Sequence, residues 1–274
     1  MLLRAFAKIN LDLRILGRRD DGYHEIQTIF QTIDWYDEIH VARAERFHFS
    51  GPGTPEDETN LVVRAVRAYE RLSNAPAPVA IHLIKNIPVG RGLGGGSSDA
   101  AVTLMGLQRL FKRALDGDEV FQELRKLGSD VPFFTIGGKA EGIGRGDDVG
   151  RLDDEGGYWL VLVDPGVSIS TAEAYSWLTL PTKSNSIEGF RAQWGNDFEA
   201  PVFKRYPELA GIKDELVKRG AFRAALSGSG SAVFGQFETE TDARRAETAL
   251  GTRFGVKVTK PLPRLDYFQR MVEE

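Results

Sequence analysis

The first stretch of the chain alternates between hydrophobic and polar residues. In the segment AKINLDLRIL the apolar side chains share one face of an extended chain: Ile9, Leu11, Leu13 and Ile15. The polar side chains share the other face: Lys8, Asn10, Asp12 and Arg14. A period of two predicts a β-strand. The Asp-Gly pair in GRRDDGYHE then predicts a turn, and IQTIFQTI predicts a second extended stretch.

Extended and helical patterns follow one another through the rest of the first half. VARAERFHFSG predicts a strand, ETNLVVRAVRAYERL a helix, and VAIHLIKNIPVG a strand that leads into a glycine-rich loop. SSDAAVTLMGLQRLF has apolar residues at helical spacing and predicts a second helix. GKAEGIGRGDDVGRLDDEGG is a polar, glycine-rich passage, and the composition changes after it. We therefore predict two domains, residues 1–152 and 153–274.

The second half has the element order of a small α+β domain. YWLVLVDPG predicts a strand, helices follow, and AFRAALSGSGSAVFGQF predicts two strands about a tight turn. DARRAETAL predicts a helix and FGVKVTKPL a final strand. This order fits a split β-α-β arrangement with helices on one face of the sheet. The predicted fold class is therefore α+β with two domains.

Composition and charge narrow the class of protein. The 274 residues are 42% hydrophobic and 27% charged, which is ordinary for a globular protein with a full core. The net charge of −4, without a basic cluster, disfavours a nucleic-acid partner. There are no cysteines, and the four histidines do not pair at a metal-ligand spacing, so we predict no protein-held metal. Because no apolar run suits a signal peptide or a membrane span, we expect a cytoplasmic protein without a membrane partner. The sequence predicts nothing about the oligomeric state.

The loop PVGRGLGGGSSDAA carries the strongest chemical signal. Glycines at positions 90, 92 and 95 satisfy the G-x-G-x-x-G spacing of dinucleotide sites, but the loop comes late in the chain and follows Pro88. It lacks the Gly-Lys-Ser/Thr ending of a Walker loop, and no H-R-D or D-F-G stretch indicates a protein kinase. Glycines let backbone N–H groups approach an anion, and a helix that starts near Ser97 offers its positive end. A phosphate site is therefore favoured over a flexible linker in which Ser98 or Asp99 caps the helix.

Other polar residues have an ordinary structural explanation when each is taken alone. A lysine such as Lys8 on the polar face of a strand is usually solvated, and Asp130 in GSDVPFF suits a turn. Tyr23 and His24, beside a turn, suit the protein surface. LSGSGSAVFG suits a plain hairpin, although its small residues would also let the backbone press against a ligand.

Taken together, these segments resemble the small-molecule kinase superfamily named for galactose, homoserine, mevalonate and phosphomevalonate kinases. Its three signature regions occur in order: the N-terminal strand with Lys8, the loop PVGRGLGGGSSDAA, and LSGSGSAVFG near the C-terminus. FAKINLDLRILGRRDDGYHEIQTIFQTIDWYDEI, LGSDVPFF and DPGVSISTAEAY are similar, more narrowly, to the 4-diphosphocytidyl-2-C-methyl-D-erythritol kinases of the non-mevalonate isoprenoid pathway. The resemblance covers nearly the whole chain and is weakest over residues 180–220.

The resemblance implies a fold and a reaction. The fold is a ribosomal-S5-like N-terminal α/β domain followed by a ferredoxin-like C-terminal domain. The reaction is ATP-dependent phosphorylation of the 2-hydroxyl group of the diphosphocytidyl alcohol, with Mg²⁺ accompanying ATP and no protein ligand assigned to the ion. Asp130 matches the catalytic base of the family, and Lys8 matches its partner, which stabilises the developing alkoxide.

The resemblance also implies binding residues, position by position. The ATP-phosphate site matches Pro88, Val89, Gly90, Arg91, Gly92, Leu93, Gly94, Gly95, Gly96, Ser97 and Ser98. The adenine border matches Asn60 and Leu61. The cytosine pocket matches Tyr23 and His24 with Asn10 nearby, and Tyr175 on the other face of the base. The family commonly has a glutamate where this chain has Arg145.

Other functions stay open at this point. A superfamily kinase for another alcohol, such as homoserine, would keep Asp130 and the loop without needing Tyr23 and His24. A ligand sensor on the same fold would bind ATP without turnover, although the presence of both Lys8 and Asp130 argues against it. A dinucleotide-dependent dehydrogenase is a more distant alternative.

Overall fold

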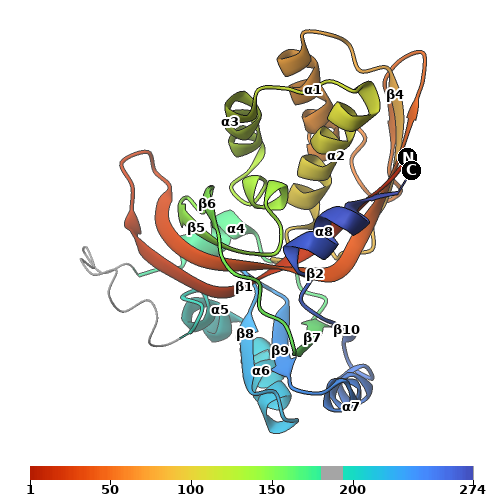
Figure 1. Cartoon of the computed structure of the whole chain (residues 1–274). Helices are drawn as coiled ribbons and strands as arrows, with labels where there is room; N and C mark the ends of the chain where they lie inside the picture. The colour runs from red at the N-terminus through yellow and green to blue at the C-terminus, as the bar shows by residue number, and fades with distance from the viewer. Residues whose placement is uncertain (180–193, 274) are drawn as a thin grey trace.

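Two β-sheets organise the fold, which a computed structural model describes for residues 1–179 and 194–273 (Figure 1). Within those residues the larger sheet has seven strands and the smaller has four. The larger sheet comprises β1 (Leu2–Arg18), β2 (His24–Arg43), β3 (His48–Ser50), β4 (Val79–Ile84), β5 (Lys139–Gly144), β6 (Asp148–Arg151) and β11 (Val272–Glu273). The smaller sheet comprises β7 (Trp159–Asp164), β8 (Arg223–Leu226), β9 (Val233–Phe237) and β10 (Gly255–Thr259).

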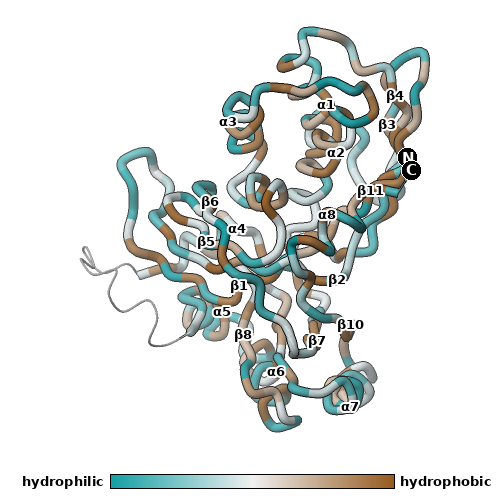
Figure 2. The backbone as a smooth tube through the Cα atoms, viewed as in Figure 1, coloured by the Kyte–Doolittle hydropathy of each residue, from teal (hydrophilic) through white to brown (hydrophobic). Residues whose placement is uncertain are grey.

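A long antiparallel hairpin of β1 and β2 carries the larger sheet. Its register runs from Leu2 opposite His40 to Arg18 opposite His24, and its tip is hydrophilic (Figure 2). β4 and β5 pair with opposite ends of β2, so one strand joins the two parts of the sheet. β1 is buried on both faces, because helices cover one face and the smaller sheet packs against part of the other. Its polar positions therefore lie inside the protein.

Helices cover the larger sheet on one side. They are α1 (Leu61–Ser73), α2 (Gly95–Phe111), α3 (Gly117–Leu127) and α8 (Arg264–Met271), with the 3₁₀ turn η1 (Pro132–Thr135). Asn60 caps α1 by accepting a hydrogen bond from the Val62 N–H at 2.9 Å. The apolar faces of α1 and α2 meet the sheet in a core that includes Leu3 and Ile39. α1 and α2 match the helices predicted from the spacing of apolar residues in the sequence.

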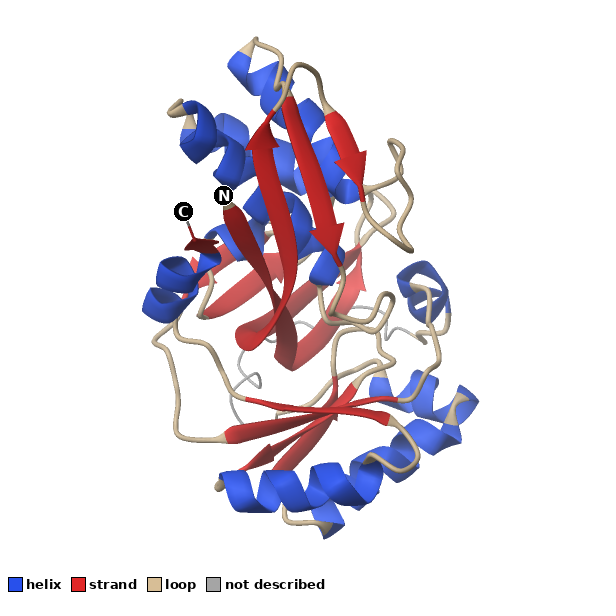
Figure 3. Cartoon of the chain, turned by 90° about the vertical axis from the view of Figure 1, so that its right-hand side faces the viewer, coloured by secondary structure: helices blue, strands red, loops and turns tan. Residues whose placement is uncertain are grey.

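The smaller sheet has the strand order β10-β7-β9-β8, with every neighbouring pair antiparallel. Among the described residues, the helices that accompany this sheet are α4 (Thr171–Ser176), α5 (Glu199–Arg205), α6 (Pro207–Lys218) and α7 (Glu240–Leu250). Figure 3 shows helices beneath this sheet, on the side away from the larger sheet. This is the ferredoxin-like order, and the predicted α+β class is confirmed.

Three local predictions were wrong or incomplete. VARAERFHFSG is not one strand: β2 ends at Arg43, and β3 begins only at His48 after a polar turn. The polar, glycine-rich passage holds the β5–β6 hairpin, in which a Cβ on Gly142 would lie 2.6 Å from the Phe30 ring. Glycine there makes room for a neighbour on β2 rather than ending a strand. The sequence after residue 262 was not assigned, yet it forms α8 and β11.

The C-terminal segment returns to the first half of the chain. β11 pairs with the start of β1, and α8 buries Tyr267 and Met271, which are one helical turn apart. The Tyr267 hydroxyl donates to the Phe134 carbonyl, within η1, at 2.6 Å. The larger sheet is therefore completed by both ends of the chain. The division at residue 152 stays a prediction.

Candidate active site

A buried lysine meets a half-exposed carboxylate near the middle of β1. Lys8 Nζ lies 3.0 Å from Asp130 Oδ2, and the two side chains are 3% and 34% exposed. The lysine also donates to Asn10 Oδ1 at 2.6 Å, and the Asn10 amide donates to Thr28 Oγ1 on β2 at 2.7 Å. Asp130 directly precedes η1, where Pro132 and Phe133 are fully packed. The structure thus brings the two predicted catalytic residues together. A hydrogen bond to Asn10 holds Lys8, and the packed turn η1 holds Asp130.

The glycine-rich loop lies directly on this pair. Gly90, Gly92 and Gly94 have φ values of +71°, +74° and +70°, a region that favours glycine. The Lys8 N–H donates to the Leu93 carbonyl at 2.9 Å. A Cβ on Gly94 would lie 2.8 Å from Lys8 Cγ, so no larger residue fits over the lysine. The loop conformation is therefore tied to the position of Lys8.

The loop ends where α2 begins. Gly94 is the cap residue, and the first turn presents free backbone N–H groups with the positive end of the helix dipole. Ser98 in that turn is buried, and its hydroxyl has no hydrogen-bond partner among the described residues. An anion at this end would find donors that nothing else in the described chain uses.

A buried charge cluster supports the first turn of α2 from below. Lys85 Nζ contacts Asp37 and lies 2.8 Å from Asp99 Oδ2. A Cβ on Gly95 would lie 3.1 Å from the same Nζ atom. Burial raises the pKa of Asp99 to about 7, with the Asp37 carboxylate adding to the shift and Lys85 opposing it. The start of the helix is therefore packed against an ammonium that two carboxylates hold.

The turn after β8 clamps the same loop from the smaller sheet. Ser227 Oγ donates to the Gly92 carbonyl at 3.0 Å, and the Ala232 N–H donates to the Arg91 carbonyl at 3.1 Å. Gly228 approaches Asn10, since a Cβ there would lie 3.3 Å from Asn10 Oδ1. The three predicted signature segments, far apart in the sequence, therefore converge on one place.

A cavity of about 730 Å³ adjoins this place and carries the aromatic residues. Its lining includes Arg18, Tyr23, His24, Ser129, Arg145, Thr171 and Tyr175. The rings of His24 and Tyr175 stack with centroids 4.5 Å apart, and the Arg145 guanidinium lies 4.6 Å from the Tyr23 ring centroid. Burial and the Asp130 carboxylate raise the pKa of Tyr175 to about 12. The cavity is therefore close enough to Asp130 for the charge of that carboxylate to act on a side chain in its lining.

Comparisons with known proteins agree with this arrangement. The sequence matches the profile described as "GHMP kinases N terminal domain" over residues 60–138 and "GHMP kinases C terminal" over residues 184–257. A 4-diphosphocytidyl-2-C-methyl-D-erythritol kinase from Solibacter usitatus is 44% identical over 91% of this chain and 85% of its own length. The chain belongs to the 4-diphosphocytidyl-2-C-methyl-D-erythritol kinase family. It is thus a kinase of the GHMP superfamily.

Solved structures place the fold in the same family. A crystal structure of 4-(cytidine 5'-diphospho)-2C-methyl-D-erythritol kinase superposes with a TM-score of 0.83 at 35% identity, covering 95% of this chain and 99% of that one. A homoserine kinase from Cytophaga hutchinsonii gives a TM-score of 0.69 at 16% identity, covering 93% and 94%. The second match shows only the shared superfamily fold. The first supports the narrower resemblance.

The two residues predicted to border the adenine lie near the glycine-rich loop. Asn60 caps α1, and Leu61 borders the first turn of α2, where a Cβ on Gly96 would lie 3.5 Å from Leu61 Cδ1. The side chains of Arg18 and Thr171 line the aromatic cavity but were not singled out from the sequence. Arg18 adjoins the DGYH turn, which was the available signal. Arg145, which the sequence analysis expected to depart from the family pattern, lines the same cavity.

Two further features bear on partners of this kinase. In the described ranges, no helix is long and apolar enough to cross a membrane. The same residues contain no group of three or more histidine, aspartate or glutamate side chains arranged to hold a metal ion.

Proposed function

We propose that the chain transfers the γ-phosphoryl group of ATP to the 2-hydroxyl group of 4-diphosphocytidyl-2-C-methyl-D-erythritol. One observation carries the proposal: the Lys8–Asp130 pair lies between a glycine-lined helix start and an aromatic cavity. The helix start suits the phosphates of a nucleotide. The cavity suits a base with its two attached phosphates. The names of the relatives support this choice of alcohol.

In the proposed step, Asp130 accepts the proton of the attacking hydroxyl group. The alcohol oxygen forms a bond to the γ-phosphorus, and the bond from that phosphorus to the bridging oxygen breaks. ADP leaves with the electron pair. Lys8, held by Asn10 and Asp130, stabilises the alkoxide that develops and fixes the carboxylate toward it. The other contribution of the protein is positioning, which is the main demand of phosphoryl transfer.

The two ligands would occupy the two sides of this pair. We propose that residues 88–98 hold the ATP phosphates, with Asn60 and Leu61 beside the adenine. The cytosine would lie among Tyr23, His24 and Tyr175. Arg18 and Arg145 give that cavity the positive charge that a diphosphate needs. In this division, residues 1–152 supply the ATP loop and both catalytic residues, and residues 153–274 supply Tyr175 and the clamp on the loop.

The glycine loop also fits a phosphate-bound Mg²⁺ ion. A Cβ on Gly92 or Gly94 would fill space against Ser227 or Lys8, so the loop keeps backbone donors close to the site. Mg²⁺ is commonly bound through substrate phosphates and water with few protein ligands, which agrees with the lack of an acidic cluster among the described residues. Residues 90–98 would hold the ion through the ATP phosphates, and the ion would neutralise part of their charge.

An ADP-release assay on the purified chain tests the proposal. With Mg²⁺ and ATP, the diphosphocytidyl alcohol should give turnover, while homoserine and the absence of any alcohol should give only background. Equal turnover with homoserine would assign a different superfamily substrate. ATP binding without alcohol-dependent ADP release would support the ligand sensor instead. Either result would reject the proposed reaction.

A further inference from the structure

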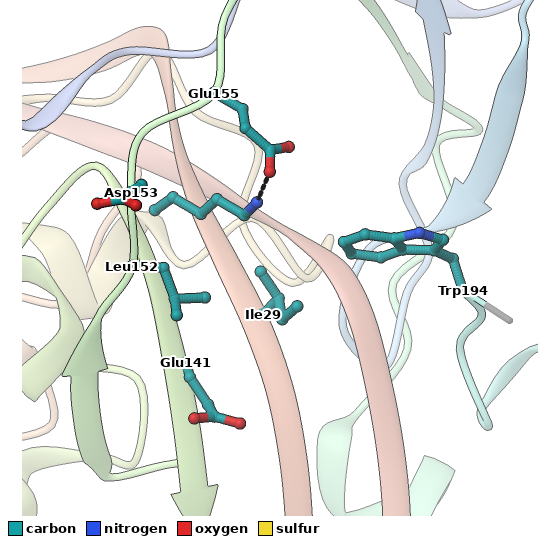
Figure 4. A pocket seen from close by; sticks show the side chains of 7 residues that line it. Ile29, Glu141, Leu152, Asp153, Glu155 and Trp194 are labelled. Carbon is teal, nitrogen blue, oxygen red and sulfur yellow. Dashed lines mark hydrogen bonds and ion pairs between the residues drawn. The ribbon is translucent and has the colours of Figure 1, made fainter. Parts of the chain in front are cut away.

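A second cavity, of about 420 Å³, lies on another part of the larger sheet (Figure 4). Ile29 of β2, Glu141 of β5, and Leu152 and Glu155 after β6 line it, and Trp194 lies across from them. Side chains alternate along a strand, so Ile29 points to the face opposite its neighbour Thr28. Thr28 holds Asn10 in the kinase site. The sheet therefore separates this cavity from the Lys8–Asp130 pair.

A buried hydrogen-bond acceptor without a partner among the described residues lies beside the lining residue Glu141. Gln27 lies two residues from Ile29 on the same face of β2 and is 8% exposed. Its amide nitrogen donates to Glu141 Oε1 at 2.7 Å, and this orientation is required because a carboxylate oxygen only accepts. The Gln27 Oε1 atom is then buried without a partner among the described residues. A buried acceptor left unpaired is costly, and a ligand with N–H groups would satisfy it.

The charges at the cavity favour a cation. Among the described residues, its lining has three carboxylates, on Glu141, Asp153 and Glu155, and one ammonium, on Lys139. Lys139 is already paired with Glu155. Within the described ranges, Asp153 has no ion-pair partner, and Glu141 is held only by the neutral Gln27 amide. Among the described lining residues, two carboxylates are thus left without a cationic partner, while the Arg223 guanidinium, which the Glu155 charge attracts, lies on Trp194 outside that lining.

One wall is a flat aromatic surface that already attracts cations. Trp194 is 48% exposed, with the Arg223 guanidinium 4.2 Å from its ring centroid and the Lys139 ammonium 5.9 Å away. Ile29 and Leu152 add apolar surface. A flat ligand body would bury against these side chains while its charged end faces the carboxylates.

We propose that this cavity is a second ligand site, separate from the kinase reaction, for a small organic cation with a flat apolar body and several N–H donors. The ligand class is an arylamidine or an arylamine in its protonated form. Its ring would lie between Trp194 and the Ile29–Leu152 wall, and its N–H groups would reach Glu141 and the free Gln27 oxygen. Anions of the same shape would meet like charge and are excluded.

Three probes of nearly equal shape test the proposal on the unmodified protein. Benzamidine is a cation, benzamide is neutral and benzoate is an anion. The chain has four tryptophans, and the Trp194 indole N–H signal in an NMR spectrum is assigned from its loss in Trp194→Phe. Trp159 is an internal control, because it does not belong to this lining and Lys260 lies 5.8 Å over its ring. Benzamidine should shift the Trp194 signal saturably, at least about tenfold more tightly than benzamide, and benzoate should not shift it.

A charge-removing variant links the effect to the cavity. Glu141→Gln keeps the shape and should weaken benzamidine about fivefold or more, while Glu240→Gln on the exposed face of α7 should leave it unchanged. Saturating CMP or an ATP analogue should not displace the probe. Equal shifts by benzamidine and benzamide, unchanged affinity in a folded Glu141→Gln protein, displacement by a nucleotide, or no Trp194 shift would each overturn the proposal.

Discussion

Two oxygen acceptors keep the charge of Lys8 inside the protein. Asp130 supplies the opposite charge at 3.0 Å, and Asn10 supplies a neutral acceptor at 2.6 Å. A buried ammonium is tolerated only when it is paired and hydrogen-bonded. Asp130, by contrast, keeps a third of its side chain exposed, and so one side of its carboxylate is open to a second ligand. The lysine is the fixed member of the pair, and the aspartate is the member free to exchange a proton.

The first prediction concerns that proton. Asp130→Asn keeps the shape and an oxygen acceptor for Lys8 but removes the base, so kcat should fall by about 10² or more. The dissociation constant for ATP and the melting temperature should stay close to those of the unmodified chain. Asp148→Asn, at an exposed position in β6, is the matched control and should retain full turnover. Near-normal kcat in a folded Asp130→Asn protein would show that another group accepts the proton.

The second prediction concerns His24, which stacks on Tyr175 in the aromatic cavity. Burial lowers the pKa of His24, with the Arg18 charge adding to the shift, so the neutral ring is favoured. His24→Ala removes an aromatic face, and the KM for the cytidyl substrate should rise about tenfold while the KM for ATP changes little. His82→Ala, on the far part of the sheet beside Ser50, is the control. Equal increases in both KM values would place the cytosine elsewhere.

The third prediction concerns the buried carboxylate of Asp99, whose pKa is raised from 3.8 to about 7. A raised folded-state pKa means that folding favours the protonated form. This contribution to the free energy of unfolding is therefore present at acid pH and is lost as the pH rises from about 4 to about 7. Asp99→Asn removes the titration and leaves Lys85 paired with Asp37 alone.

Urea unfolding of both proteins, without nucleotide, measures the difference between them. The variant should gain stability relative to the unmodified chain across this pH range, by about 1 kcal/mol or more at pH 8. Titrating groups that do not interact with Asp99 cancel in the difference. A difference in free energy that stays constant with pH would mean that Asp99 titrates as an ordinary carboxylate.

At the scale of elements, the glycines of the loop have different tasks. Those at 94 and 95 leave room for the side chains of Lys8 and Lys85 beneath them, so added methyl groups would press into the protein. Gly96 differs because it is exposed, and a Cβ there would meet only Leu61 at an ordinary 3.5 Å. Its added methyl group would therefore stand where we propose that the nucleotide binds.

The fourth prediction compares two glycines that each lie in the first turn of a helix. Gly96→Ala in α2 and Gly117→Ala in α3 should both leave the melting temperature unchanged or slightly higher, since alanine favours helix by up to about 1 kcal/mol. Only Gly96→Ala should weaken ATP binding, which calorimetric titration measures. Unchanged ATP affinity in Gly96→Ala would argue against a nucleotide bound beside this turn.

The sequence predicted elements well where the pattern of apolar residues had one explanation. The helix containing Val62 and Val66 and the alternating strand containing Ile9 both formed as expected. β5 was missed because its glycines hid a strand, and the nearest atom to a Cβ on Gly142 belongs to Phe30, a contact across the sheet. The alternation of residues along β1 also could not predict that its polar face is buried, since this burial depends on which layers cover the sheet.

At the scale of the whole molecule, the site depends on contacts between distant parts of the chain. Gly92 and Ser227 are 135 positions apart, yet they share a hydrogen bond. Tyr267, close to the C-terminus, supports the carbonyl of Phe134 just after Asp130. The periodicity of apolar residues carries no information on contacts between residues so far apart in the sequence. Only the family resemblance could therefore group these segments in advance. It did not reveal the C-terminal return or the cavity around Trp194.

The last prediction tests how the two sheets hold the ATP loop together. Arg91 in the loop pairs with Asp164 at the end of β7, with Nε 2.6 Å from Oδ1. The pair is largely buried, so it fixes the loop more than an exposed pair would. Asp164 lies outside the residues assigned to ATP. If the pair acts by positioning, Arg91→Ala and Asp164→Asn should each raise the ATP dissociation constant about fivefold, or ~1 kcal/mol.

The double variant separates positioning from direct contact. Both substitutions break the same pair, so their combined effect should be no larger than that of the stronger single variant. Lys213→Ala breaks a pair of equal length, with Glu199 at 2.6 Å, inside the second half and should leave ATP affinity unchanged. Loss of affinity in Arg91→Ala alone, with Asp164→Asn at the normal value, would mean that the guanidinium contacts the nucleotide itself. In that case the smaller sheet would not hold the loop through this pair, and it would act on the loop through the hydrogen bonds from Ser227 and Ala232.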